Sequence, residues 1–307
     1  MSIYEYEIVI PPNANEVVVR FRVSSEARVP AGLPLPIYAQ VTMPDNVPEA
    51  WSTLLTGVHL RFHHNKVSPE KVKHILDVCN ARGLKAGLVI GVHNAPGPHG
   101  GVFTRYTRRL PDGELVPDYW SDAFMSEWLS IRQAVAQAVR NHPALAWVGM
   151  DFGMDDEAWP TKPWSRVPQE LQWEYVTRYI FASWELAKMY APLPVLAQVA
   201  TFPRQGLEML YWGYRSYKSP DNLGIKHNGF HPSADTVPGL EAKIRPFWDW
   251  CRSKGRTAIL EPGRVPSGNA EEDRPVVEQM MERAVSWGAH ALVLQPQFLD
   301  ALATGSG

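Results

Sequence analysis

Acidic side chains directly follow two apolar runs of the sequence. The run at 145–150 is followed by four acids, which are Asp151, Asp155, Asp156 and Glu157. A later run, RTAILE, ends in Glu261. Two carboxyl groups on opposite sides of an acetal can cleave it, because one protonates the leaving oxygen while the other attacks the sugar carbon or activates water. The two positions are therefore candidates for the cleavage of a glycosidic bond. For the first cluster, the alternative is an acidic loop that caps the next helix.

Apolar runs alternate with helical patterns along most of the chain. Strands are predicted near residues 38, 60, 88, 148, 197, 225, 259 and 293, with helices between most of them. A brief helix is predicted at 49–54, and the stretch at 211–222 is predicted to be irregular. This alternation is typical of a (β/α)8 TIM barrel, which we expect over 35–302; a doubly wound open sheet is the alternative. Alternating apolar and charged residues before position 24 predict a β-hairpin, so that 1–34 forms a hairpin with a linker and 303–307 a flexible tail.

The composition narrows the possible partners. The chain has 307 residues, 45% of them hydrophobic, and a formal net charge of −2. This balance gives no broad basic surface for nucleic acid or an anionic membrane, and no apolar run approaches the length of a membrane span. The first twenty residues lack the order of a signal peptide, although a secreted parent protein remains open. Cys79 and Cys251 are expected to be buried thiols.

Polar residues collect at the predicted carboxyl ends of the strands, where parallel α/β folds place their sites. Besides the acids, we expect the following to line a substrate pocket: Arg61, His63, His93, Asn94, Trp159, Gln198, His227, Asn228 and Gln295. Arg61 lies inside an apolar strand, and a buried guanidinium demands an anionic partner, for which Glu261 would be suitable.

Several stretches carry a family resemblance. They are GVHLRFHHNKVSPE, RGLKAGLVIGVHN, LVPDYWSDAFMSEW, NHPALAWVGMDFGMDDEAW, LGIKHNGF and AILEPG. The chain resembles the barrel superfamily of retaining glycoside hydrolases, with the acid/base after strand four and the nucleophile after strand seven. It is most similar to bacterial glycosidase-like barrels of unassigned function. The resemblance implies that Glu157 is the proton donor and Glu261 the nucleophile, supported by Arg61, His93 and Asn228.

The chain also departs from the superfamily pattern. The Asn that commonly precedes the acid is Asp156 here, and the Gln295 region replaces a strand-eight tryptophan. Asp155 or Asp156 remains an alternative to Glu157 as the acid.

Two other functions are alternatives to the hydrolysis of glycosides. A metal-dependent amidohydrolase barrel needs a His-x-His motif and a histidine after strand five, whereas this chain has adjacent His63 and His64 and offers Gln198. We therefore predict no metal and no cofactor. The predicted partner is an oligo- or polysaccharide substrate. The alternative function is a non-catalytic carbohydrate-binding barrel or a scaffold domain of a larger protein, which would need no matched pair of carboxylates.

Overall fold

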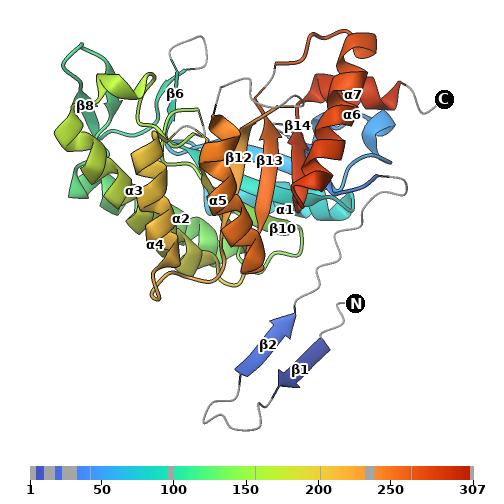
Figure 1. Cartoon of the computed structure of the whole chain (residues 1–307), viewed down its shortest axis with the longest axis horizontal. Helices are drawn as coiled ribbons and strands as arrows, with labels where there is room; N and C mark the ends of the chain where they lie inside the picture. The colour runs from blue at the N-terminus through green and yellow to red at the C-terminus, as the bar shows by residue number, and fades with distance from the viewer. Residues whose placement is uncertain are drawn as a thin grey trace.

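Eight parallel strands close into a barrel in the computed structural model of the chain, which describes residues 5–9, 18–22, 33–41, 43–95, 100–155, 157–200, 202–231, 239–263 and 265–304 (Figure 1). The strands are β3 (Ile37–Gln40), β4 (Gly57–His63), β5 (Lys85–Gly91), β10 (Leu145–Met150), β11 (Val195–Gln198), β12 (Leu223–Phe230), β13 (Ala258–Pro262) and β14 (Ala291–Leu294). Each expected strand position lies in one of them, so the predicted (β/α)8 TIM barrel is confirmed.

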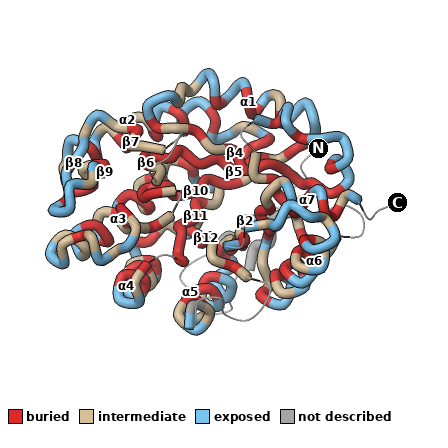
Figure 2. The backbone as a smooth tube through the Cα atoms, turned by 90° about the horizontal axis from the view of Figure 1, so that it is seen from above, coloured by how far each residue is buried: buried red, intermediate tan, exposed pale blue. Residues whose placement is uncertain are grey.

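Helices surround the barrel, as the view along its axis shows (Figure 2). They are α1 (Pro69–Ala81), α2 (Asp122–Val139), α3 (Gln169–Tyr190), α4 (Arg204–Arg215), α5 (Leu240–Ser253), α6 (Ala270–Ser286) and α7 (Pro296–Ala303). Local sequence sets their ends: the hydroxyl of Ser68 accepts a hydrogen bond from the Lys71 amide at the start of α1, and Gly83, with φ 69°, follows its end.

Two expectations about local structure were wrong, and one helix was missed. The stretch at 211–222 was expected to be irregular, but its first part belongs to α4, whose Leu207, Leu210 and Tyr214 are buried at helical spacing. The brief helix expected at 49–54 is only a 3-10 turn, η2 (Glu49–Trp51), which follows the similar η1 (Pro44–Asn46). Helix α7 was not expected.

The long connection at 93–120 contains two small antiparallel pairs. One joins β6 (His93–Asn94) to β7 (Gly101–Val102), and the other joins β8 (Thr107–Arg109) to β9 (Leu115–Pro117). Another 3-10 turn, η3 (Trp164–Arg166), lies in the loop after β10. Arg166 forms ion pairs with Asp112 and Glu114, at 2.5 and 2.8 Å. These contacts hold the connection after β5 against the loop after β10.

The expected N-terminal hairpin is present. Strands β1 (Glu5–Val9) and β2 (Val18–Arg22) pair antiparallel, with Glu5 opposite Arg22. In the described part of the chain, no helix is long and apolar enough to cross a membrane. Both cysteines are buried free thiols.

Inside the barrel, the large side chain of Trp147 packs against a glycine of a neighbouring strand. A cluster of Tyr38, Val89, Trp147, Leu196, Ile259, Ala291 and Val293 occupies the inside of the strand cylinder. The indole of Trp147 lies over Gly87: a Cβ built at Gly87 would lie 2.0 Å from an atom of that ring. Because protein interiors are close-packed, only glycine leaves room for the tryptophan here.

We expect Gly87→Ala to destabilise the protein by about 1–3 kcal/mol, because the added methyl group overpacks the barrel interior. The measurement is the free energy of unfolding in urea. Gly87→Ala should cost less in a chain that already carries Trp147→Leu than in the parent chain, because the smaller side chain frees the space. If the two substitutions are additive, the contact between Gly87 and Trp147 is not the cause.

Candidate active site

Side chains that point into the barrel form a layer of charged and polar groups at the carboxyl ends of the strands. Successive side chains of a strand point to opposite faces, so Glu261 shares the inward face of β13 with the interior residue Ile259. The carboxylate of Glu261 accepts hydrogen bonds from the Lys226 ammonium and, at 3.4 Å, from the Gln40 amide. Lys226 on β12 is 1% exposed and forms an ion pair with Glu261. This pair holds Glu261 inside the barrel mouth.

Arg61 contacts other partners than the one suggested by the sequence. Its guanidinium forms an ion pair with Asp151 at 3.9 Å and donates a hydrogen bond to Asn94 at 2.6 Å. Gly91 makes room for this pair, because a Cβ there would lie 2.6 Å from an Asp151 carboxylate oxygen and 3.2 Å from the guanidinium. Among the described residues, Lys226 thus forms an ion pair with Glu261, and Asp151 forms one with Arg61.

His59 lies below these two ion pairs. It is buried and its ring is 5.1 Å from that of Trp147. Burial lowers the pKa of His59 well below its usual value, and the charges of Lys226 and Arg61 lower it further. The imidazole is therefore neutral at physiological pH, and the two cations that lower its pKa belong to the two ion pairs.

The loop after β10 is a tightly fixed turn. Its backbone folds back so closely at Gly153 that a Cβ would lie 2.4 Å from the Glu157 carbonyl oxygen. Asp155 has φ 56°, the only left-handed non-glycine residue in the described part of the chain. The Asp155 amide donates to the His93 carbonyl, and its carboxylate accepts from the Ala95 amide at 2.8 Å and pairs with Lys162 at 3.2 Å. Asp155 thus ties the turn to β6.

Glu157 lies on the same turn. Its carboxylate is 3.0 Å from the Lys162 ammonium and the side chain is 19% exposed. Burial raises the pKa of Glu157, and the neighbouring Lys162 opposes this rise. The group therefore holds its proton to a higher pH than a glutamate in water.

Most of the other predicted residues lie on the same strand ends or loops. His93 is buried, and burial lowers its pKa. His63 stacks on Phe103 with ring centroids 3.9 Å apart. Trp159 lies on the turn with Glu157, and the Lys162 ammonium is 5.2 Å from its ring. Gln295 caps α7 directly after β14. Asp156 lies outside the described residues.

Two amides in this region have buried oxygens that accept no hydrogen bond from any residue that the structure describes. They are the Gln198 oxygen on β11 and the Asn228 oxygen on β12. Gln198 follows the inward alternation, because Leu196 precedes it by two positions. Asn228 lies where the register of β12 against β13 is irregular, between His227 and Phe230. Buried polar groups are nearly always hydrogen-bonded, so the two oxygens are available to hydroxyl donors of a ligand.

His227 does not join this group. It follows the inward Lys226 and points to the opposite face of β12, where its ring packs against those of Phe230 and Trp287, at 6.2 and 6.0 Å. Burial lowers the pKa of His227 to about 3, assisted by Lys243 and Arg283 on the surrounding helices. The structure places it between the barrel and its helices, in contrast to the expected place in the pocket.

Sequence reasoning missed Lys226, Gln40 and His59. Lys226 carries the same signal that identified Arg61, a charged residue inside an apolar strand. In the described part of the chain, no group of three or more His, Cys, Asp or Glu side chains could hold a metal ion.

Comparison with known proteins shows a likeness in fold. Neither a protein-family model nor a curated protein matches the sequence. The glycoside hydrolase domain of PelA from Pseudomonas aeruginosa is similar with a TM-score of 0.52 at 13% identity, covering 86% of this chain and 95% of that one. The glycoside hydrolase family 5 enzyme PbGH5A from Prevotella bryantii B14 has a TM-score of 0.50 at 11% identity, covering 86% of this chain and 87% of that one.

A third solved structure is the β-mannanase of Thermomonospora fusca, with a TM-score of 0.50 at 8% identity, covering 86% of this chain and 78% of that one. At these identities the likeness is one of fold. The chain has the TIM-barrel fold of glycoside hydrolases.

Proposed function

We propose that the protein is a retaining glycoside hydrolase with Glu261 as nucleophile and Glu157 as general acid/base. The observation that carries this proposal is the position of Glu261, which the buried ammonium of Lys226 and the amide of Gln40 hold inside the barrel mouth. A nucleophile must be ionised and fixed in direction, and an ammonium partner favours both. The glycoside hydrolase barrels of similar fold support the choice of substrate.

The reaction would proceed in two displacements. A carboxylate oxygen of Glu261 attacks the anomeric carbon, the bond to the leaving oxygen breaks, and that oxygen takes the proton of Glu157. Water then attacks the anomeric carbon, gives a proton to Glu157, and releases the Glu261 carboxylate. The raised pKa of Glu157 suits this role, because the group must be protonated at the start.

The contacts of Asp155 favour Glu157 as the acid. Both carboxylate oxygens of Asp155 have partners, one the amide of Ala95 and the other the ammonium of Lys162. A carboxylate whose two oxygens fix a left-handed turn cannot move toward a leaving group without disturbing the loop. Glu157 contacts the same ammonium but has the raised pKa that a proton donor needs.

The remaining polar groups would bind the sugar. The buried amide oxygens of Gln198 and Asn228 can accept hydrogen bonds from sugar hydroxyls, and Trp159 offers an aromatic face. Arg61 would hold Asn94 and Asp151 in place, as its contacts indicate. The substrate is thus a carbohydrate, and the lining determines which sugar is accepted.

A screen of aryl β- and α-glycosides tests this function. We expect release of the aryl group from at least one of them, with the first sugar product in the anomeric configuration of the substrate by proton NMR. Inversion of configuration would contradict the double displacement. Sugar binding without any turnover would instead favour the carbohydrate-binding barrel.

A further inference from the structure

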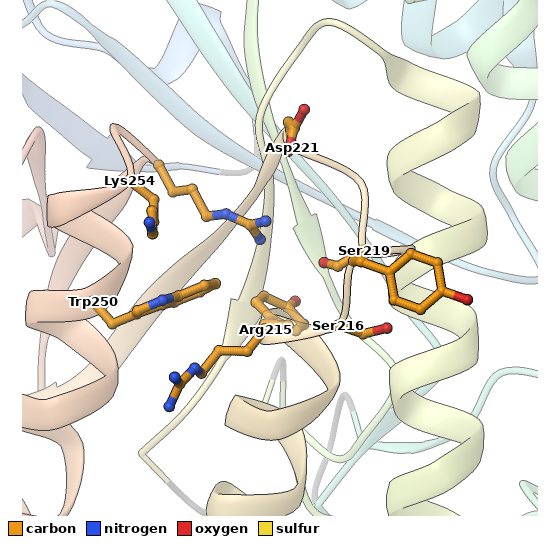
Figure 3. Close-up of a pocket in the computed structure, with 9 residues that line it drawn as sticks. Arg215, Ser216, Ser219, Asp221, Trp250 and Lys254 are labelled. Atoms are coloured by element: carbon orange, nitrogen blue, oxygen red, sulfur yellow. The ribbon is translucent and has the colours of Figure 1, made fainter.

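A cavity lies at the opposite end of the barrel from the candidate active site. It has a volume of about 290 Å³ and is lined by Tyr214, Arg215, Ser216, Tyr217, Ser219, Asp221, Trp250, Lys254 and Arg256. Figure 3 shows Arg215 and Ser216 at the end of α4, Trp250 and Lys254 on α5, and Ser219 and Asp221 in the turn before β12 around this cavity. Asp221 precedes β12 and Arg256 precedes β13, whereas Glu261 lies near the carboxyl end of β13.

The lining of the cavity is positively charged. The lining contains three cations and one carboxylate. The cations are Arg215, Lys254 and Arg256, and the carboxylate is that of Asp221. Among the residues that the structure describes, none of these three cations has a carboxylate within ion-pair distance. The cavity therefore offers a net positive charge to a ligand.

Arg256 is built into the wall of the cavity. It is 8% exposed and lies against two rings, 4.8 Å from the centroid of Trp250 and 6.0 Å from that of Tyr214. One of its N–H groups donates to the Leu223 carbonyl at 3.4 Å. These contacts hold the guanidinium in one place, so that its direction is fixed before any ligand binds.

One hydroxyl at the cavity has no hydrogen-bond partner among the described residues. It belongs to Ser219, which is 9% exposed and whose hydroxyl oxygen is buried. An unpartnered buried hydroxyl costs free energy, which a ligand that bonds to it would recover. Tyr217 is 91% exposed beside it and leaves an aromatic face open to solvent.

The preference of helix C-termini for cations explains only part of the positive charge at the cavity. Arg215 ends α4 and Lys254 caps α5, and cations are favoured at helix C-termini. That preference does not account for Arg256, which precedes a strand, or for the unpartnered hydroxyl of Ser219. These two features point to a ligand.

We propose that this cavity binds an anionic sugar, a ring with hydroxyl groups that carries a carboxylate or a phosphate. Arg215, Lys254 and Arg256 would hold the acid group, and Ser219 would bond to a ring hydroxyl next to the aromatic wall of Trp250 and Tyr217. The site is separate from the candidate active site, so the proposal does not depend on the proposed hydrolysis.

The test follows the indole N–H signal of Trp250 by NMR while D-glucuronate, glucose 6-phosphate, glucose or inorganic phosphate is added. Trp250→Phe identifies the signal. We expect saturable shifts with the two anionic sugars, and none with glucose. Inorganic phosphate should bind more weakly than glucose 6-phosphate, because it has no ring. Saturation by glucuronate alone or by glucose 6-phosphate alone would show which acid group the site prefers, and either supports the proposal.

A double variant that carries both Arg215→Gln and Lys254→Gln should bind the anionic sugars roughly tenfold or more weakly, because two charge-assisted contacts are lost. Both positions are exposed. The matched control is the double variant Lys188→Gln and Arg252→Gln, which removes two exposed cations from the last turns of α3 and α5, outside the cavity. It should change the dissociation constant by less than about twofold. Equal shifts with glucose, equal affinity for inorganic phosphate, or unchanged binding in the first double variant would each overturn the proposal.

Discussion

Glu261→Gln is expected to remove turnover of every glycoside that the protein cleaves, with a loss in kcat on the order of 10⁴-fold or more. The amide keeps the size of the side chain and can still accept a hydrogen bond from Gln40. It has no negative charge, however, and cannot form the bond to the anomeric carbon. Initial rates of aryl release from the parent protein and the variant provide the measurement.

The control for this variant must separate lost chemistry from lost folding. Gln at position 261 leaves the buried ammonium of Lys226 without its countercharge, which destabilises a protein. Thermal unfolding should therefore be measured beside activity, with Glu282→Gln, an exposed position on α6, as the matched control. A fluorinated sugar that traps the intermediate should label Glu261 in the parent protein. A label on Asp151 or Asp155 would contradict the assignment.

Glu157→Gln should separate substrates by their leaving groups. General-acid assistance is worth about 10²- to 10⁴-fold where the leaving oxygen needs a proton. We therefore expect a loss of this size for alkyl glycosides and saccharides, and little change in the first step for dinitrophenyl glycosides. The ratio of kcat/KM between the two substrate classes gives the result.

The pH profile of the parent protein should report the same group. A general acid works only while protonated, so activity falls as the pH rises through its pKa, and the raised pKa of Glu157 moves this fall to higher pH. The fall should therefore be seen in kcat/KM of the parent protein for substrates whose leaving oxygen needs a proton, and it should be absent for dinitrophenyl substrates in both the parent protein and Glu157→Gln. Asp155→Asn is the discriminating variant: if it spares activated substrates selectively and Glu157→Gln does not, Asp155 is the acid.

The chain's local patterns predicted the architecture well. Each of the eight strands of the barrel was recognised as a short apolar run, and Ser68 and Ser121 cap α1 and α2 through hydrogen bonds to the amides of Lys71 and Phe124. Such signals depend on residues within one or two turns of each other. Helix α4 was hidden because its buried face carries Gly206 and Tyr214 among turn-like residues, which weaken the helical pattern.

The pairing of charges could not be predicted in this way. Strands of a parallel barrel are buried on both faces, so their apolar pattern does not tell which side chains point into the lumen. Lys226 points inward and meets Glu261, while the next residue, His227, points outward to Trp287. A shift of one residue in the register of β12 would exchange the two.

The sequence by itself thus determined that acidic side chains follow the fourth and seventh barrel strands, because the order of residues along the chain fixes which residues end a strand. Only the tertiary structure decided that Glu261 meets Lys226 and that Arg61 meets Asp151. The partners in each pair are 35 and 90 residues apart, and their contact depends on closure of the barrel and the register of its strands.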